Sequence, residues 1–123
     1  MQLQNFGFEK ATSILFETTF GLCSCLGDYT PANVSKKFKG YVSVTDSVKQ
    51  SINIPAIKVL SYIGIDTGKQ YAEKMGIKFD ENDDSYALAL GGMTYGTNLK
   101  DLTNSYTTFA NNGQFANSTF VQY

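Results

Sequence analysis

The sequence predicts a mainly α-helical protein with short β segments. Residues 99–110 carry apolar side chains at helical spacing, and an apolar stretch that begins at Pro55 runs to Gly64. β-Branched and aromatic residues gather only in short runs toward the two ends of the chain. With 123 residues, of which 42% are hydrophobic and 14% aromatic, the chain corresponds to one domain or part of one and can form a core.

The N-terminal residues 1–28 give the weakest signals. Within them, the β-branched and aromatic residues of 12–20 predict a short strand. Residues 28–44 contain glycine, proline and asparagine and predict a surface connection. At the other end of the chain, residues 115–123 are again rich in β-formers and predict a second strand.

Two helices are predicted around a break in the middle of the chain. Thr45 is a suitable N-cap for a short helix over residues 45–50. The fixed φ of Pro55 suits the first turn of the next helix, and we expect the preceding residue, Ile54, to be extended. This second helix is apolar almost all round, which predicts a buried element, and Gly64 is expected to end it.

Two further helices are predicted downstream. Asp66 can cap a third helix that ends at Gly76, and Asn98 can cap a fourth helix that closes at Gly113. Asp101, three residues after Asn98, completes an approximate capping box. The fourth helix has one apolar stripe, expected to lie in the core, which comprises Leu99, Leu102, Tyr106, Phe109 and Ala110.

The connection between the third and fourth helices begins with an acidic run, Asp80–Asp84. It starts like a calcium-binding loop, but Ser85 stands where the sharp-turn glycine belongs and Gly91 where the bidentate glutamate belongs, so a solvated loop is expected. The apolar run Ala87–Leu90 is then broken by Gly91 and Gly92, which predicts a close approach of backbone segments.

Composition excludes several classes of function. The chain has no histidine, which excludes Ser-His-Asp and Cys-His catalysis, and its formal charge of −1 gives no reason to expect nucleic acid. The lysines Lys36, Lys37 and Lys39 predict a solvated loop. Cys23 and Cys25 are too close for an easy disulfide and too few for zinc, so no metal or cofactor is expected. No apolar run approaches the ~20 residues that span a bilayer.

The break itself carries the candidate functional residues, Ser51 and Asn53. In an extended or turning backbone, side chains two residues apart point the same way, so these two can face a cleft while Ile52 and Ile54 turn inward. A hydroxyl that relays a proton beside an amide that orients a substrate suits an acyl-transfer site. Serine and asparagine are also common helix N-caps, so simple capping is the alternative interpretation.

The order of several short segments resembles the transpeptidase domain of penicillin-binding proteins, more narrowly the bifunctional class A peptidoglycan synthases. The similarity covers about three quarters of the chain. The segments that carry it are Tyr29–Asn33, Gly40–Thr45, Ser51–Lys58, Tyr62–Ile65, Tyr71–Ile77, Ala87–Gly92 and Tyr106–Gly113.

That family carries three active-site motifs, S-x-x-K, S-x-N and K-T-G, and only the second is found in this chain. No serine is followed three residues later by lysine, and Thr67-Gly68 is preceded by Asp66 instead of lysine. The resemblance therefore implies that residues 29–123 are an internal part of a transpeptidase domain. The fold it implies is the helical subdomain of the β-lactamase/transpeptidase-like α/β fold.

The resemblance also implies a function. Members of the family crosslink peptidoglycan by acyl transfer from D-Ala-D-Ala stem peptides, face the cell wall outside the cytoplasm, and are acylated by β-lactams. By similarity, Ser51 would pass a proton toward the leaving amine, and Asn53 would hydrogen-bond the substrate and brace the lysine of S-x-x-K. Alone, the chain is expected to be inactive. A non-catalytic wall-binding module and an unrelated small helical interaction domain are the alternatives.

Overall fold

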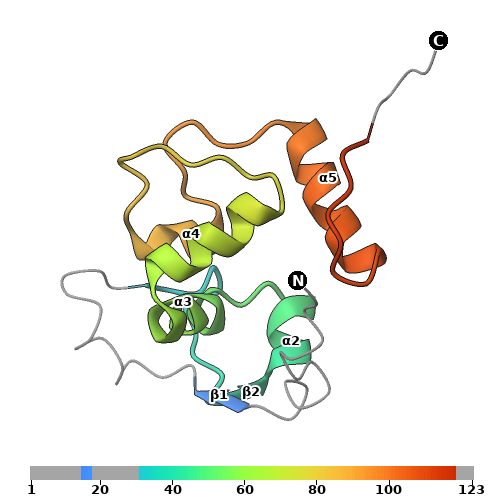
Figure 1. The fold of residues 1–123 in the computed structure, drawn as a ribbon. Coiled ribbons are helices and arrows are strands. Elements are labelled where there is room, and N and C mark those ends of the chain that lie inside the picture. The colour runs from blue at the N-terminus through green and yellow to red at the C-terminus, as the bar shows by residue number, and fades with distance from the viewer. Residues whose placement is uncertain (1–14, 18–30, 119–123) are drawn as a thin grey trace.

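The computed structural model describes residues 15–17 and 31–118 (Figure 1). Its elements are the strands β1 (Leu15–Glu17) and β2 (Tyr41–Ser43), the helices α2 (Val44–Lys49), α3 (Asn53–Ile63), α4 (Ile65–Lys74) and α5 (Leu99–Ala110), and the 3₁₀ helix η3 (Tyr86–Leu90). The described part of the chain is thus mainly helical with short β segments, which confirms the predicted fold class.

The two strands pair antiparallel, with Phe16 opposite Val42. The strand predicted within residues 12–20 is therefore present, and its described part is three residues long. The surface connection predicted over residues 28–44 is partly wrong, because it contains β2. A three-residue strand next to Gly40 is too short to show alternation, and its pairing partner lies far away in sequence.

Other predictions near the ends fall partly or wholly outside the described residues. Cys23 and Cys25 belong to this group, as do residues 119–123 of the predicted C-terminal strand. The described part of that strand, residues 115–118, is irregular.

Helix α2 begins two residues earlier than predicted. Its N-cap is Ser43, whose Oγ accepts a hydrogen bond from the Asp46 amide at 3.0 Å and donates one to the Asp46 carboxylate at 2.7 Å. Thr45 is instead inside the first turn. With their three-residue spacing, Ser43 and Asp46 form two hydrogen bonds at this end of the helix, whereas Thr45 lies one residue before Asp46.

The core lies where α3 packs against η3 (Figure 1). Ile57 of α3 is fully buried, and Ile54 is 5% exposed. The prediction that α3 is buried all round is wrong for its other face, where Tyr62 is 73% exposed. A single 3₁₀ helix covers only one side of α3, and the opposite side has no comparable cover among the described residues.

Glycines end α3 and α4 as predicted, but Asp66 does not cap α4. Gly64 (φ +84°) is both the C-cap of α3 and the N-cap of α4, so Asp66 lies within the first turn. There its carboxylate still faces the positive end of the helix dipole. Gly76 (φ +84°) follows the end of α4, and a Cβ there would come within 2.8 Å of the Phe115 ring.

The acidic run is not simply a solvated loop, because the carboxylate of Asp83 is buried. It accepts hydrogen bonds from the amide of Asp80 at 2.9 Å and from both the amide and the hydroxyl of Thr94 at 2.7 Å. These hydrogen bonds, led by that of the Asp80 amide and aided by the nearby charge of Lys69, hold the pKa of Asp83 below its ordinary value of 3.8. Asp83 thus ties the acidic run to the segment that precedes α5.

The predicted backbone approach is confirmed at Gly92 but not at Gly91, where a Cβ would have nothing within 4 Å. The Gly92 amide donates to the Ala87 carbonyl at 2.9 Å, and a Cβ on Gly92 would lie 2.9 Å from the Ala87 Cβ. Gly91 has φ +82°, a conformation that glycine adopts without strain.

Helix α5 has the predicted cap but buries the opposite face. The Asn98 Oδ1 accepts from the Asp101 amide at 2.8 Å, which confirms the N-cap, and the Asp101 carboxylate accepts from the Asn98 side-chain Nδ2 at 2.8 Å. The apolar stripe predicted to lie in the core is exposed, with Leu99 79% and Tyr106 65% exposed. The residues that are buried on α5 are polar: Asn104, Ser105 and Thr108.

The polar face of α5 is held by the chain that follows it, which runs back along the helix (Figure 1). The Asn104 carboxamide donates to Asn117 Oδ1 at 2.8 Å and accepts from the Ser118 amide at 3.2 Å. The Thr107 hydroxyl accepts from the Ala116 amide at 3.2 Å. Hydrogen bonds, not apolar packing, therefore decide which face of α5 is covered.

Candidate functional site

The break between α2 and α3 is made by Ser51 in a left-handed conformation, with φ +51°. The Ser51 amide donates to the Val48 carbonyl at 3.2 Å, and the Ile52 amide donates to the Ser47 carbonyl at 2.9 Å. This pair of bonds is the Schellman motif, in which glycine is the usual left-handed residue. A serine in that position is strained by roughly 1–2 kcal/mol.

The extended residue at the break is Ile52, not Ile54. Ile52 has φ −82° and ψ 120° and is the N-cap of α3, which begins at Asn53. The expectation that Pro55 opens the helix is therefore wrong by two residues. Pro55 is tolerated at the third helical position because the first four amides of a helix have no intrahelical acceptor.

The predicted alternation of side chains across the break is confirmed for its apolar members. Ile52 and Ile54 are 8% and 5% exposed and turn inward. Ser51 is exposed and Asn53 is half-buried. The backbone break therefore presents the hydroxyl outward beside a carboxamide at the first position of α3.

Neither candidate side chain acts as the N-cap of α3. The N-cap residue, Ile52, has no side chain that can do so, and the cap is supplied from 21 residues earlier in the chain. The Oδ1 of Asn33 accepts from the Ile54 amide at 3.4 Å. In return, the Nδ2 of Asn53 donates to the Ala32 carbonyl at 2.9 Å.

The remaining hydrogen-bonding groups define what this site can do chemically. The Ser51 hydroxyl has no hydrogen-bond partner within residues 15–17 and 31–118, and the same holds for the Oδ1 of Asn53. A free hydroxyl can pass on a proton, and a free amide oxygen can accept a hydrogen bond from a ligand. Within the described ranges, neither group has a base or nucleophile as its hydrogen-bonding partner.

Sequence reasoning gave no role to Asn33, although it lies in one of the segments that carry the family resemblance. Asn33 is buried, and its Nδ2 donates to the Lys37 carbonyl at 2.9 Å. An asparagine two residues after a proline is typical of a turn. The local sequence therefore predicts the turn but not the long-range hydrogen bond of Asn33.

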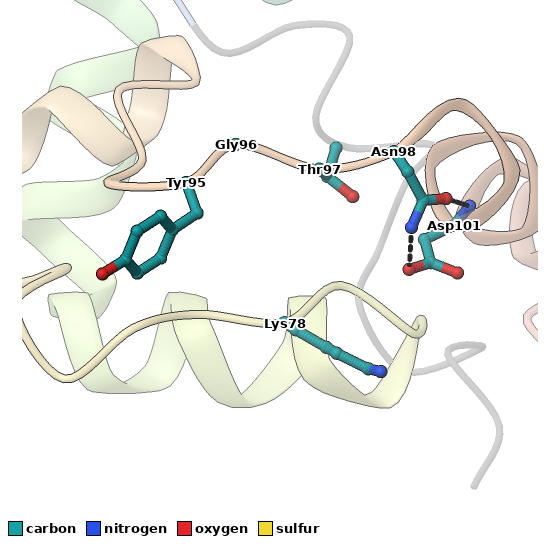
Figure 2. Close-up of a pocket in the computed structure, with 6 residues that line it drawn as sticks. All are labelled: Lys78, Tyr95, Gly96, Thr97, Asn98 and Asp101. Carbon is teal, nitrogen blue, oxygen red and sulfur yellow. Dashed lines mark hydrogen bonds between the residues drawn. The ribbon is translucent and has the colours of Figure 1, made fainter.

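A separate hollow lies beside the start of α5 (Figure 2). It has a volume of about 360 Å³ and is lined by Lys78, Tyr95, Gly96, Thr97, Asn98 and Asp101. Figure 2 shows that the side chain of Asn98 is hydrogen-bonded both to the Asp101 carboxylate and to the backbone. Neither Ser51 nor Asn53 lines the hollow, so it does not coincide with the predicted site, and two of its polar side chains are occupied in capping α5.

The described residues offer neither a metal site nor a membrane-spanning helix. Among them, no group of three or more histidine, cysteine, aspartate or glutamate side chains could hold a metal ion. In that same part of the chain, every helix is too short or too polar to cross a bilayer.

Comparison with known proteins gives consistent matches. No protein-family profile matches the chain. Penicillin-binding protein 1F of Bacillus subtilis is 40% identical over 95 residues, which is 77% of this chain and 13% of that protein. Penicillin-binding protein 1A of Clostridium novyi is 38% identical over 92 residues, 73% of this chain and 11% of the relative. Penicillin-binding protein 4 of B. subtilis is 36% identical over 95 residues, which is 76% of this chain and 15% of that protein. The chain therefore spans only a small part of the length of these relatives.

Proposed function

Because the chain belongs to the penicillin-binding protein family over about three quarters of its length, we propose that residues 29–123 are part of a transpeptidase domain. The whole protein would crosslink peptidoglycan by acyl transfer from D-Ala-D-Ala stem peptides, outside the cytoplasm, and would be acylated by β-lactams. The exposed apolar stripe of α5 supports this proposal, since a stripe of that size is usually covered by further protein.

In this proposal, Ser51 and Asn53 form one side of the transpeptidase cleft. The Ser51 hydroxyl passes a proton toward the leaving amine, and the Asn53 carboxamide hydrogen-bonds the substrate backbone and braces the lysine of the S-x-x-K motif. The observation that carries these roles is the left-handed backbone of Ser51, which holds an exposed hydroxyl in a strained position. Backbone strain of this kind concentrates at functional sites.

The 123-residue chain has neither an S-x-x-K nor a K-T-G motif. Acylation needs a nucleophile and a base within hydrogen-bonding reach of each other. We therefore expect this chain by itself to form no covalent adduct with a fluorescent penicillin.

The test is a chimera in which residues 31–118 replace the homologous stretch of penicillin-binding protein 1F of B. subtilis. We expect the chimera to be labelled covalently by a fluorescent penicillin. Ser51→Ala should slow labelling by about 10²-fold or more, the usual range for a lost proton-transfer group. Asn53→Ala should also slow labelling, because the hydrogen bonds to substrate and lysine are lost. Ser61→Ala is the matched control, because the Ser61 hydroxyl donates to the Lys58 carbonyl within α3 and should leave labelling unchanged.

Two results would contradict the proposal. If a folded chimera is labelled equally well with and without Ser51 and Asn53, neither residue belongs to the site. A robust covalent band on the 123-residue chain alone would place the nucleophile elsewhere. Reversible binding of muropeptides by the chain, with no labelling of the chimera, would instead favour the non-catalytic wall-binding alternative.

A further inference from the structure

Two asparagines, Asn33 and Asn53, form a reciprocal clamp across the start of α3. Each carboxamide hydrogen-bonds to the backbone of the residue next to the other asparagine: Asn53 Nδ2 to the Ala32 carbonyl, and the Ile54 amide to Asn33 Oδ1. We propose that Asn33 is a positioning residue that fixes the orientation of the Asn53 carboxamide.

The clamp determines which end of the Asn53 amide faces away from the protein. A carboxamide has a donor end and an acceptor end that are similar in shape. With Nδ2 donating to the Ala32 carbonyl at 2.9 Å, the Oδ1 is directed away from that carbonyl. A flipped amide would bring two acceptor oxygens together and would lose the bond. The position of the Ala32 carbonyl therefore sets the polarity of Asn53.

Asn33 in turn sets the position of the Ala32 carbonyl. Its side chain is buried and spans two structures, donating to the Lys37 carbonyl at 2.9 Å and accepting from the Ile54 amide. Its own carbonyl accepts from the Lys36 amide at 2.8 Å, which closes the same turn. In a variant with a truncated Asn33 side chain, only the bond from Asn53 Nδ2 to the Ala32 carbonyl would still join this turn to the first residues of α3, within the described part of the chain. The Asn53 amide should then rotate between its two orientations.

The importance of this orientation rests on the proposed function, in which Asn53 contacts both substrate and lysine. A carboxamide held in one orientation presents a fixed acceptor and one remaining N–H to a ligand. One that rotates presents the correct pattern only part of the time, which weakens every contact that depends on it.

The experiment uses the intact 123-residue chain, labelled with ¹⁵N and ¹³C, and observes the side-chain amide of Asn53 by NMR. In the wild-type chain we expect two separate Nδ2 proton resonances, one of them protected from solvent exchange by the Ala32 carbonyl. Asn33→Ala should raise the exchange rate of that proton about five- to tenfold, as the loss of one hydrogen bond predicts.

Two further variants separate positioning from general destabilisation. Asn33→Asp keeps an acceptor for the Ile54 amide but loses the donor to the Lys37 carbonyl, so it should restore part of the Asn53 protection. Asn104→Ala removes a carboxamide that is buried similarly on α5, and it should leave the Asn53 resonances unchanged. If Asn33→Ala does not fold, Asn33→Ser takes its place, with a smaller change in the same direction.

Unchanged Asn53 exchange in the folded Asn33→Ala or Asn33→Ser variant would overturn the proposal, as would the same increase in Asn104→Ala. This result is independent of the chimera. If Asn53→Ala leaves the chimera fully active while Asn33→Ala still raises the exchange of the Asn53 amide, the proposed function fails and the positioning by Asn33 stands.

Discussion

Helices α3 and α5 are similar in length and both carry apolar stripes, but they bury opposite kinds of surface. Helix α3 packs its isoleucines against η3, and Ile57 is fully buried. Helix α5 leaves its stripe exposed and buries Asn104 and Thr108 under the returning chain. An apolar stripe indicates which face of a helix can be buried, whereas the neighbouring segments of the chain determine which face is buried.

The difference also separates two ways of holding a helix. On α3 the cover is apolar, and its removal should leave a cavity. On α5 the cover is a segment tied by side-chain hydrogen bonds, such as that between Asn104 and Asn117 at 2.8 Å. Each such bond contributes only about 0.5–1.5 kcal/mol net, but a buried partner left without its bond costs more. The two helices should therefore respond differently to the same kind of substitution.

The largest effect is expected from Ile57→Ala in α3. Truncation of a fully buried isoleucine removes apolar contacts and leaves a cavity, which costs about 2–5 kcal/mol. The matched substitution on the α5 stripe, Leu99→Ala, should change the free energy of unfolding by less than about 0.5 kcal/mol, because Leu99 is 79% exposed. Urea denaturation followed by circular dichroism measures both. Equal losses of stability in the two variants would mean that the apolar stripe of α5 is buried.

The next largest effect is expected from Asn104→Ala on the polar face of α5. The substitution leaves Asn117 and the Ser118 amide without their partner and should cost about 1–3 kcal/mol. Asn111→Ala serves as the control: this side chain is exposed and donates one long bond, at 3.3 Å, to the Gln114 carbonyl. Hydrogen exchange should show the loss of protection concentrated in α5. A loss spread evenly over α3 and α5 would argue against two separate modes of burial.

Local features of these two regions could be predicted from the sequence. The cap of α5 depends on Asn98 and Asp101, which are three residues apart, and the structure confirms it. The inward side chains of Ile52 and Ile54 follow from the alternation around the break. Both depend on a few consecutive residues, where backbone geometry leaves few choices.

Features that depend on distant segments could not be predicted. The bond between Asn33 and the Ile54 amide joins residues 21 apart, and no spacing rule predicts it. The burial of Asp83 depends on Thr94, 11 residues later. Pro55 is a strong local signal for the break, whereas Ser51 makes it by adopting a conformation that serine rarely takes. Such a strained backbone goes against the conformational preference of serine, so it could not be predicted from the sequence and is seen only in the structure.

A smaller effect, and a gain, is expected from Ser51→Gly at the break before α3. Glycine adopts φ +51° without strain, so the substitution should raise the free energy of unfolding by up to about 1 kcal/mol after the entropy of the more flexible unfolded chain is subtracted. Ser51→Ala, which keeps the strain and removes the hydroxyl, should leave stability nearly unchanged. A loss of stability in both variants would instead indicate that the hydroxyl holds the break together.

The smallest effect is expected from pH between 7 and 5, and it concerns Asp83, which ties the acidic run to the segment before α5. Asp83, bonded to Thr94, has a pKa below 3.8 in the folded chain, lower than in the unfolded chain. The unfolded state therefore binds the proton first as pH falls. The stability from this carboxylate is complete above the unfolded pKa and is lost as pH falls through the folded one.

Asp83→Asn isolates that contribution, because the amide cannot titrate. The difference in unfolding free energy between wild type and this variant should stay constant from pH 7 to 5 and shrink below about pH 4. Denaturation at closely spaced pH values measures the difference directly. A difference that instead grows as the pH falls through 6 would require a raised pKa, and thus a carboxylate without the three hydrogen bonds that the structure assigns to it. In that case the acidic run would be tied to the segment before α5 by contacts other than those of the Asp83 carboxylate.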